Sequence, residues 1–373
     1  MDNYFQKRTW AEISLGNLKH NYSIIRNHIP EKCKFLGIVK ADAYGHGALE
    51  VSKTFESCGA DYLAVSCLDE ALELRNGGIT IPILILGHTP SEYTKQLISN
   101  NLTQTVTNLA KAKEYSQQAQ SLGQELKIHI KLDTGMSRLG FLMDNAVENI
   151  AASCSLPNLI AEGIYTHFAV SDEKGEENKA FTLLQYAKFC SVVDELCGLG
   201  IQFSLRHCAN SGAVVNYPEM CLDMVRPGLL LYGYGDNHEL GLKPCMRLVT
   251  KITTIKHIPS GSTVSYGRHF TAESSTRIGV LGVGYADGLP RASSNKCSYY
   301  ANGSYVNQIG AICMDMCMVD LTNVPGTSVG SEIELFGPNN DIYSLANAAS
   351  TIPYELLCSV TKRVPRIYLE NAF

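Results

Sequence analysis

Basic surface charge and long apolar stretches are both missing from this 373-residue sequence. It holds 31 lysines and arginines against 36 aspartates and glutamates, so its net charge is −5. A chain without a basic excess has no electrostatic means of holding nucleic acid. No apolar run approaches the roughly 18 residues that cross a membrane, and the polar start MDNYFQKRTW excludes a secretory signal peptide. We therefore expect a soluble protein without membrane contact, whose partners are small molecules.

Paired cysteines are also missing, although the chain has 13 cysteines. The count is odd, the residues are scattered and no C-x-x-C pair occurs. This pattern is typical of reduced thiols in a cytoplasmic protein and excludes a disulfide framework. The closest pair lies in CMDMC at 313–317, where two thiols without a neighbouring histidine are too few for a structural zinc site. We expect no metal.

Apolar runs alternate with helical patterns from residue 33 to about residue 235. The apolar runs are nearly continuous, as in strands whose two faces are both covered, and their alternation with helices indicates a parallel sheet. About eight such units fit a closed (β/α)8 TIM barrel. An open doubly wound sheet is the alternative, but no G-x-G-x-x-G follows the first strand. The predicted strands are 33–40, 61–66, 81–87, 102–107, 126–133, 159–168, 203–208 and 223–233.

The pattern changes after about residue 243, where short runs of strand-forming residues are separated by glycine, proline and asparagine. Asn302 and Gly303 stand between two such runs, which is a hairpin signal. The change predicts a barrel over residues 1–243 and a mostly β domain over 244–373. In the second domain we expect strands at 247–258, 262–267, 276–287, 297–321 and 332–337, a short helix at 342–350 and a closing strand at 363–369.

Lys40 ends the first predicted strand. Active groups of TIM barrels lie where the strands meet their following loops, and a buried lysine costs free energy unless it is paired or neutralised. A neutral lysine there can act as a nucleophile and bind an aldehyde cofactor as an imine. The alternative is a lysine whose stem lies in the barrel mouth and whose ammonium reaches water.

The loops after the seventh and eighth strands are the usual phosphate site of such barrels. Asn210 and Ser211 follow the seventh strand and could offer a hydroxyl and backbone N–H groups at a helix start, while Gly228 would let the backbone approach an anion. The same Asn-Ser-Gly stretch is also an ordinary helix cap. Together with Lys40, the pattern points to pyridoxal 5'-phosphate.

Nine segments of the chain resemble the alanine racemase family, in family order and over nearly the whole length. They are KADAYGHG (40–47), KLDTGMSRLGF (131–141), YTHFAVSDE (165–173), HCANSGA (207–213), MVRPG (224–228), VSYG (264–267), GYADGLPR (284–291), ICMDMCM (312–318) and RVPRIY (363–368). The resemblance implies a pyridoxal-phosphate enzyme that interconverts L- and D-alanine and supplies D-amino acid for peptidoglycan precursors.

The resemblance also assigns the two proton carriers. Lys40 would hold the cofactor and serve one face of the substrate α-carbon, and Tyr266 would serve the opposite face. Racemisation needs this pairing, because one group removes the proton and another returns it from the far side. Tyr266 would come from the partner subunit, so we expect a head-to-tail homodimer with composite sites.

Cofactor and substrate contacts follow from the same motifs. Arg226 would face the pyridine nitrogen, held by His207, and Arg138 would bind the substrate carboxylate. Lys131 would carry a carbamate that orients Arg138, unless it is an unmodified structural lysine. The remaining contacts are Tyr44, Asn210, Ser211, Gly228, Leu229 and Tyr354 around the cofactor phosphate, His167 at its ring, Met314 from the partner subunit at the substrate, and Tyr285 and Asp315 in the access channel. Ala311 departs from the family, many of whose members have arginine there.

Three alternative functions remain at this stage. A serine racemase of the same family, as in vancomycin-resistance proteins, shares these motifs, and the chain would then be the cytoplasmic domain of a longer membrane-anchored protein. A pyridoxal-phosphate decarboxylase of similar architecture would need an acidic residue where Arg226 stands. A non-catalytic cofactor carrier would have no use for the second domain.

Overall fold

The computed structural model describes residues 8–235, 240–371 and 373. The chain divides into two compact units. The barrel unit comprises Leu18–Ala43 and Ala48–Leu242, and the β unit comprises Met1–Asn17, Tyr44–Gly47 and Lys243–Phe373. Among the described residues, none of the helices has the length and apolar character needed to traverse a bilayer.

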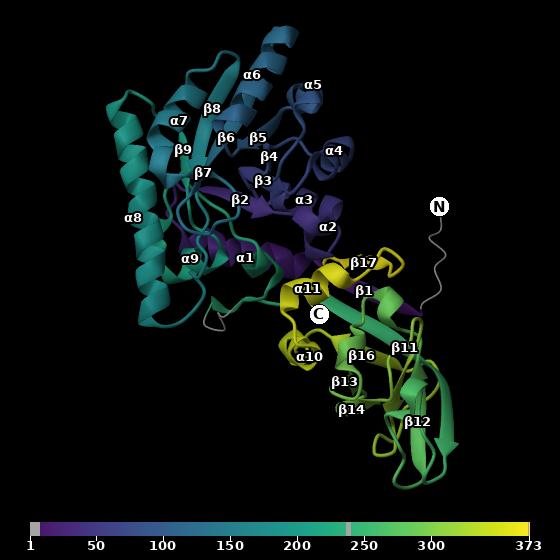
Figure 1. The fold of residues 1–373 in the computed structure, drawn as a ribbon. Helices are drawn as coiled ribbons and strands as arrows, with labels where there is room; N and C mark the ends of the chain where they lie inside the picture. Colours follow the sequence, from purple (N-terminus) through teal and green to yellow (C-terminus); the bar gives the residue numbers. More distant parts are fainter. Residues whose placement is uncertain (1–7, 236–239, 372) are drawn as a thin grey trace. The chain divides into compact units, whose positions relative to one another are not determined.

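The barrel unit contains eight parallel strands in the order β10-β2-β3-β4-β5-β6-β8-β9 (Figure 1). Two backbone bonds join the ends of this row, from Asp223 N–H to Arg206 O at 3.0 Å and from Arg226 N–H to Ala209 O at 2.9 Å. The predicted TIM barrel is therefore confirmed. The strands are β2 (Lys34–Ile38), β3 (Tyr62–Val65), β4 (Ile83–Ile85), β5 (Leu102–Val106), β6 (Leu126–Asp133), β8 (Leu159–Tyr165), β9 (Leu205–His207) and β10 (Met224–Val225), with the short β7 (Phe141–Leu142) paired to β6.

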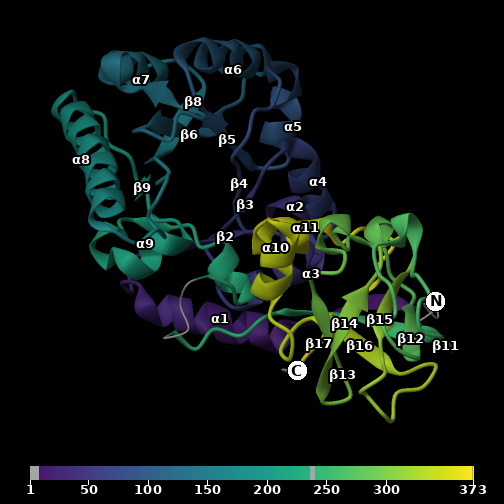
Figure 2. The same ribbon diagram turned by 60° about the horizontal axis from the view of Figure 1, so that its bottom comes forward.

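Helices cover the outside of the barrel, and Figure 2 shows α4 to α8 following one another around the strands. The α6 helix illustrates why they form where the sequence predicts: the Asn108 side chain accepts the Lys111 N–H at its start, and Gly123 ends it at φ 61°. The helices of this part are α1 (Leu15–His28), α3 (Ala48–Ser57), α4 (Leu68–Asn76), α5 (Thr94–Ser99), α6 (Leu109–Leu122), α7 (Ala146–Cys154), α8 (Glu176–Gly198) and α9 (Ser211–Asn216).

The predicted eighth strand, 223–233, is wrong beyond Val225. Pro227 has no N–H to give to a sheet, and Leu229–Tyr232 forms a 3₁₀ helix that is buried throughout. The apolar run therefore reflects burial rather than extended backbone. This change of direction puts Arg226 and Gly228 directly at the end of the shortened β10.

The β unit is built on a mixed sheet in the order β12-β15-β14-β13-β16-β11-β1-β17. The predicted hairpin is confirmed: Ala301 pairs with Ser304, and Asn302 and Gly303 both have positive φ, as a tight primed turn requires. The elements are β1 (Thr9–Ser14), β11 (Met246–Ile258), β12 (Thr276–Leu281), β13 (Ser298–Ala301), β14 (Ser304–Ile309), β15 (Cys317–Asp320), β16 (Glu332–Phe336), β17 (Arg366–Leu369), α10 (Ile342–Ala349) and α11 (Pro353–Ser359).

Several stretches of the β unit differ from the sequence prediction: the strand expected at 276–287 ends at Leu281, and the helix α11 was not expected. The expected strand 262–267 is wrong, because Thr263 forms only an isolated bridge to Thr271 and Tyr266–Arg268 is a 3₁₀ turn. The strand β1 (Thr9–Ser14) pairs antiparallel with β11 and parallel with β17. It thus lies in the sheet of the β unit, although the sequence boundary placed it with the barrel.

A left-handed turn, α2 (Lys40–Tyr44), follows β2. Ala41, Asp42, Ala43 and Tyr44 all have φ between 52° and 54°, a conformation that costs about 1–2 kcal/mol for each residue with a Cβ. Hydrogen bonds hold it in place: Ala43 N–H donates to Val39 O at 2.9 Å, and Ala41 N–H to Glu70 Oε1 at 2.7 Å. Strain of this kind persists where the surroundings impose it, which is typical of functional sites.

Replacing Ala41 with glycine is expected to stabilise the protein. Relief of about 1–2 kcal/mol of backbone strain exceeds the roughly 0.5–1 kcal/mol of extra chain entropy that glycine loses on folding. Ala41 is exposed, so no packing is lost. The same change at Ala152, exposed in the right-handed α7, is the control and should lower the free energy of unfolding by about 1 kcal/mol. Urea titration followed by circular dichroism measures both, and equal losses would contradict the expectation.

Candidate active site

Lys40 lies just beyond the carboxyl end of β2 and begins the left-handed turn. The strand is pinned at this end, because Val39 N–H donates to Ala64 O of β3 at 2.9 Å. The lysine is half-buried. Its position agrees with a functional group at the carboxyl face of a barrel.

Arg226 is the most deeply buried cation at this end of the barrel, with 4% of its surface exposed. Its Nη1 donates to His207 Nδ1 at 2.9 Å, and its Nη2 donates to Thr166 O at 2.7 Å and to Cys208 O at 3.1 Å. Burial lowers its pKa to about 10, so it keeps its charge at neutral pH. Among the described residues no carboxylate forms an ion pair with it. A buried guanidinium in this position has donors to offer to a neutral acceptor.

The two histidines beside Arg226 are neutral. Burial, and then the charge of Arg226, hold the pKa values of His167 and His207 well below the ordinary range. Arg226 Nη2 lies 3.4 Å from His167 Nδ1. Since a guanidinium only donates, His207 Nδ1 must be an acceptor.

Lys131 lies on β6, 7% exposed, with its Nζ 3.3 Å from Leu132 O and 5.0 Å from the centroid of the Tyr165 ring. Burial, and then Arg226, lower the pKa of this amine well below its usual range. The exposed Arg138 follows in the loop after β6, which Asp133 shapes by accepting the N–H groups of Gly135 and Ser137 at 3.0 Å each. β6 thus carries an amine with a lowered pKa, and the loop after it carries an exposed guanidinium.

The loops after β9 and β10 meet. Ser211 Oγ accepts the Gly228 N–H at 2.9 Å, which joins the starts of α9 and of the 3₁₀ helix that begins at Leu229. Asn210 caps α9, since its Oδ1 accepts the Ala213 N–H at 3.0 Å and the Ser171 hydroxyl at 2.7 Å. Asn210 therefore shapes the loop. Ser211 offers a hydroxyl there, and Gly228 offers backbone that a ligand can approach closely.

Tyr44 and Tyr354 lie together in the β unit, with their ring centroids 5.8 Å apart. Tyr44 is 6% exposed, and burial, followed by Tyr354, raises the pKa of its hydroxyl. Tyr354 stands in the first turn of α11, a helix that the sequence did not predict. The hydroxyl of Tyr44 is thus a neutral hydrogen-bonding group.

Tyr266, Tyr285 and Met314 lie on neighbouring segments of the β unit. Tyr285 N–H donates to Cys313 O and Ala286 N–H to Met314 O, each at 3.0 Å. The Ser265 hydroxyl next to Tyr266 donates to Ala311 O at 2.7 Å, which links all three segments.

Four side chains on these segments are exposed: 73% for Tyr266, 53% for Met314, 46% for Met316 and 42% for Tyr285. We call these four residues the exposed patch. Contiguous exposed apolar side chains mark interaction sites.

Three ion pairs join the loops near the exposed patch. Asp287, 1% exposed, lies 2.6 Å from Arg8 Nη2 and 3.1 Å from Arg363 Nε. Arg363 Nη2 also lies 2.8 Å from Asp315 Oδ1. Ala311 is buried among these segments, and its carbonyl accepts hydrogen bonds from the Ser265 hydroxyl and the Cys313 thiol. The structure thus has no cation at position 311.

Comparison with known proteins decides the family. The family models "Alanine racemase, N-terminal domain" and "Alanine racemase, C-terminal domain" match residues 13–236 and 245–368. An alanine racemase of Clostridium perfringens (strain SM101) is 42% identical over 97% of this chain and 95% of its own length. The chain belongs to the alanine racemase family.

Solved structures of the alanine racemase family agree. That of Clostridium difficile 630 has a TM-score of 0.93 at 38% identity, covering 99% of this chain and 97% of that one. The Bacillus anthracis enzyme with bound L-Ala-P has a TM-score of 0.92 at 31% identity, covering 99% and 96%. The predicted family, the isomerase class of an amino-acid racemase, and the pyridoxal 5'-phosphate cofactor are confirmed.

The residues of the barrel unit fit this cofactor. Lys40 would supply an amine for its aldehyde, and Arg226 would supply guanidinium donors without a carboxylate partner among the described residues. Ser211 and Gly228 supply a hydroxyl and a backbone that a phosphate can approach. The guanidinium donors of Arg226 and the neutral histidines beside it suit a cofactor whose ring nitrogen stays unprotonated and accepts a hydrogen bond.

Sequence reasoning missed two members of the polar interior. His129 on β6 lies 3.0 Å from His207, and Glu162 on β8 lies 3.6 Å from His129. The signal was present in the sequence: His129 is two residues before Lys131 in a predicted strand, so both point to the same face of the sheet.

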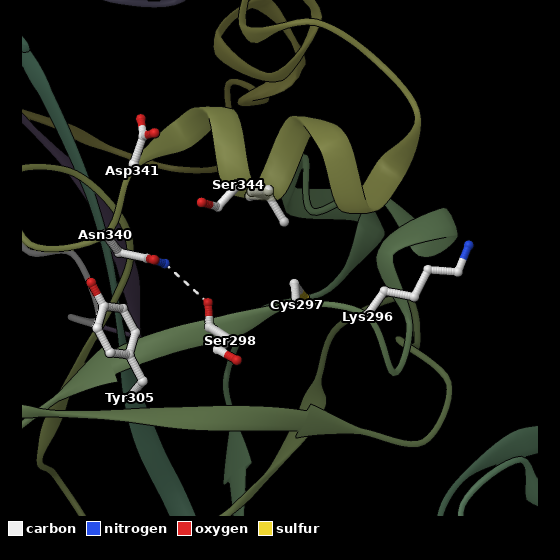
Figure 3. Close-up of a pocket in the computed structure, with 8 residues that line it drawn as sticks. Lys296, Cys297, Ser298, Tyr305, Asn340, Asp341 and Ser344 are labelled. Atoms are coloured by element: carbon white, nitrogen blue, oxygen red, sulfur yellow. Dashed lines mark hydrogen bonds between the residues drawn. The ribbon is translucent and has the colours of Figure 1, made fainter.

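A shallow polar hollow of the β unit contains none of the predicted site residues. Figure 3 shows Lys296, Tyr305 and Asp341 around it, with the Asn340 amide donating to Ser298 O at 3.0 Å. Among the described residues, no cluster of three or more histidines, cysteines or carboxylates could hold a metal ion.

Proposed function

We propose that this chain interconverts L- and D-alanine, with Lys40 and Tyr266 as the two proton carriers. Bound pyridoxal phosphate withdraws electrons from the amino acid and makes its α-hydrogen acidic. Lys40 accepts or returns the proton on one face, and Tyr266 does so on the other. The observation that carries the proposal is the match of both family domains along the whole chain, together with Lys40 at the carboxyl face of the barrel.

Arg226 tunes this chemistry. Its guanidinium stays protonated, so it donates to the ring nitrogen and leaves that nitrogen unprotonated. Electron withdrawal is then moderate, which limits side reactions such as transamination. A decarboxylase of this architecture would have an acidic residue in that place, and Arg226 with its histidine and carbonyl acceptors speaks against it.

The remaining residues bind and orient. Arg138 pairs with the substrate carboxylate, for which a planar guanidinium is suited. His167 contacts the cofactor ring, while Tyr285 and Asp315 line the access channel. The phosphate contacts are Tyr44, Asn210, Ser211, Gly228, Leu229 and Tyr354, of which Asn210 acts by shaping the loop.

The active molecule is a head-to-tail homodimer whose composite sites take Tyr266 and Met314 from the partner. The exposed patch supports this, because a monomer gains nothing from two exposed tyrosines and two exposed methionines on neighbouring segments. A non-catalytic carrier would not need this patch. In this arrangement residues 1–243 hold the cofactor, with Tyr354 as an added phosphate contact, and residues 244–373 complete the partner's site.

Alanine is the preferred substrate, since the named relatives are alanine racemases. The test compares kcat/KM for L-alanine and L-serine by chiral chromatography with added cofactor. We expect the larger value for alanine. A larger value for serine would overturn the substrate, and release of carbon dioxide from a basic amino acid would overturn the reaction.

Lys131 carries a carbamate in the active enzyme. Burial, and then the charge of Arg226, lower the pKa of its amine and so favour the neutral form that reacts with carbon dioxide. The resulting anion would lie near the charges of Arg226 and Arg138. Lys131→Ala is therefore expected to raise KM for alanine about tenfold or more, the effect of a lost charge-assisted hydrogen bond. Acetate should restore part of the loss, and Lys127→Ala, on the same strand, should change nothing. Absence of rescue by acetate would contradict the carbamate.

A cytoplasmic location is also proposed. None of the 13 cysteines forms a disulfide, and burial raises the pKa of the Cys33 thiol to about 12. Thiols that are not joined in disulfides suit a reducing compartment.

A further inference from the structure

A row of buried polar side chains runs through the barrel unit behind Arg226. Arg226 Nη1 contacts His207 Nδ1 at 2.9 Å, and His207 Nε2 contacts His129 Nδ1 at 3.0 Å. His129 Nε2 lies 3.6 Å from Glu162 Oε2. Both histidines are fully buried. The row thus connects the guanidinium to a carboxylate through two imidazoles.

Hydrogen-bonding rules fix the direction of every proton in this row. Arg226 only donates, so His207 Nδ1 accepts and a neutral His207 carries its hydrogen on Nε2. That hydrogen points at His129 Nδ1, which must also accept. His129 therefore carries its hydrogen on Nε2, facing the carboxylate of Glu162. The opposite tautomers would set an imidazole N–H against a guanidinium N–H.

Both imidazoles are held neutral. Burial is the main cause that lowers the pKa values of His129 and His207, and the charge of Arg226 lowers both further. At the far end, His129 is the main cause of a lowered pKa for Glu162, and the Tyr62 hydroxyl lowers it as well. An anion at one end and a cation at the other favour a single orientation of the row.

The backbone of β8 accommodates the contact between His129 and Glu162. The pairing of β6 with β8 shifts by one residue between Ile128 and His129, so that Ala161 and Gly163 are paired and Glu162 is the extra residue. Such a bulge re-aims a side chain, here the carboxylate that faces His129. Glycine at position 163 makes room for the His129 ring, because a Cβ there would lie 2.7–2.8 Å from three atoms of that ring. The ring therefore lies directly against the β8 backbone.

His129 Nε2 and Glu162 Oε2 have no hydrogen-bond partner among the described residues. Each of these two atoms can serve as the hydrogen-bond partner of the other. Leaving a buried polar atom without a hydrogen bond costs free energy. A small rotation of either side chain closes the remaining gap to a hydrogen bond. No other part of the site explains why two such groups face each other in the barrel interior.

We propose that His129 and Glu162 are positioning residues that hold His207 in its accepting tautomer and thereby fix Arg226 for the ring nitrogen of the cofactor. This inference rests on the proposed function, which assigns Arg226 to that nitrogen. Neither residue touches substrate or cofactor. Their effect passes through His207 alone.

The experiment compares four variants. Glu162→Leu removes the acceptor, Glu162→Gln keeps an oxygen acceptor without charge, and Gly163→Ala displaces the His129 ring. Ile128→Val is the control, since it trims a buried neighbour on the opposite face of β6. Nitrogen-15 spectra of histidine-labelled, cofactor-free protein report the tautomers, and titration with pyridoxal phosphate gives its affinity and absorbance spectrum.

We expect Glu162→Leu and Gly163→Ala to disturb the His129 and His207 signals and to weaken cofactor binding about tenfold, the effect of roughly one buried hydrogen bond. The kcat for alanine should fall while KM stays near the wild-type value, because the row does not contact the substrate carboxylate. Glu162→Gln should restore most of the loss, and Ile128→Val should show wild-type spectra.

Wild-type histidine signals, cofactor affinity and kcat in Glu162→Leu would overturn the inference. Arg226→Lys separates this from a failure of the proposed function. If Arg226→Lys shifts the cofactor spectrum and Glu162→Leu does not, the inference alone fails. If Arg226→Lys leaves the spectrum unchanged, Arg226 does not face the ring nitrogen, and the inference falls with that assignment.

Discussion

Tyr266→Phe is expected to lower kcat/KM for alanine about 10³-fold, within the usual range for a lost acid–base group. Phenylalanine keeps the ring but has no proton to give or take. Tyr266 is 73% exposed in the β unit, so the fold and the affinity for pyridoxal phosphate should not change. The loss would therefore report chemistry alone.

Isotope exchange distinguishes this mechanism from a general loss of activity. With Lys40 intact, one enantiomer of alanine should still exchange its α-hydrogen in deuterium oxide without inverting. Tyr305→Phe is the matched control, because Tyr305 is also an exposed tyrosine of the β unit and bonds only to Asn339 O among the described residues. Unchanged racemisation by Tyr266→Phe would refute the two-carrier mechanism.

Lys40→Ala is expected to abolish racemisation, by about 10⁴-fold or more, because it removes both the covalent attachment of the cofactor and one proton carrier. Borohydride should then fix no cofactor to the chain, whereas wild-type protein should be labelled at Lys40. Lys34→Ala, at the other end of β2, is the control and should be labelled and active. Labelling of the Lys40→Ala protein would show that another amine holds the cofactor.

Mixing the two inactive variants tests the composite sites. If Tyr266 comes from the partner, a mixed dimer of Lys40→Ala and Tyr266→Phe chains has one intact site and one site without either group. If the two chains are present in equal amounts and exchange freely, half of the dimers are mixed. Each mixed dimer has one intact site out of two, so the mixture should recover about a quarter of wild-type activity. No recovery in demonstrably mixed dimers would place both residues in one subunit's site.

Local sequence patterns determined much of the fold, because strands, helices and tight turns depend on residues that are neighbours in the chain. Nearly continuous apolar runs separated by helical segments predicted the parallel strands of the barrel, and Asn302–Gly303 predicted a hairpin whose positive φ values only such residues adopt readily. The family motifs likewise predicted residues for the site, since they are contiguous in the chain. Lys40 and Arg226 indeed stand at the ends of their strands.

Packing decided the features whose causes lie far apart in the chain. The left-handed turn contains alanine, aspartate and tyrosine, which disfavour it, and contacts such as that of Ala41 with Glu70 impose it. The apolar run 229–232 became a buried 3₁₀ helix, because Pro227 ends the strand while burial still requires apolar side chains.

The amino-acid sequence by itself determined the barrel, the second β domain, the family and the chemical groups available. Only the tertiary structure decided that β1 joins the sheet of the β unit, and that a bulge turns Glu162 toward His129. The physical reason is that strand partners and buried hydrogen bonds are chosen between residues distant in sequence, where local periodicity carries no information.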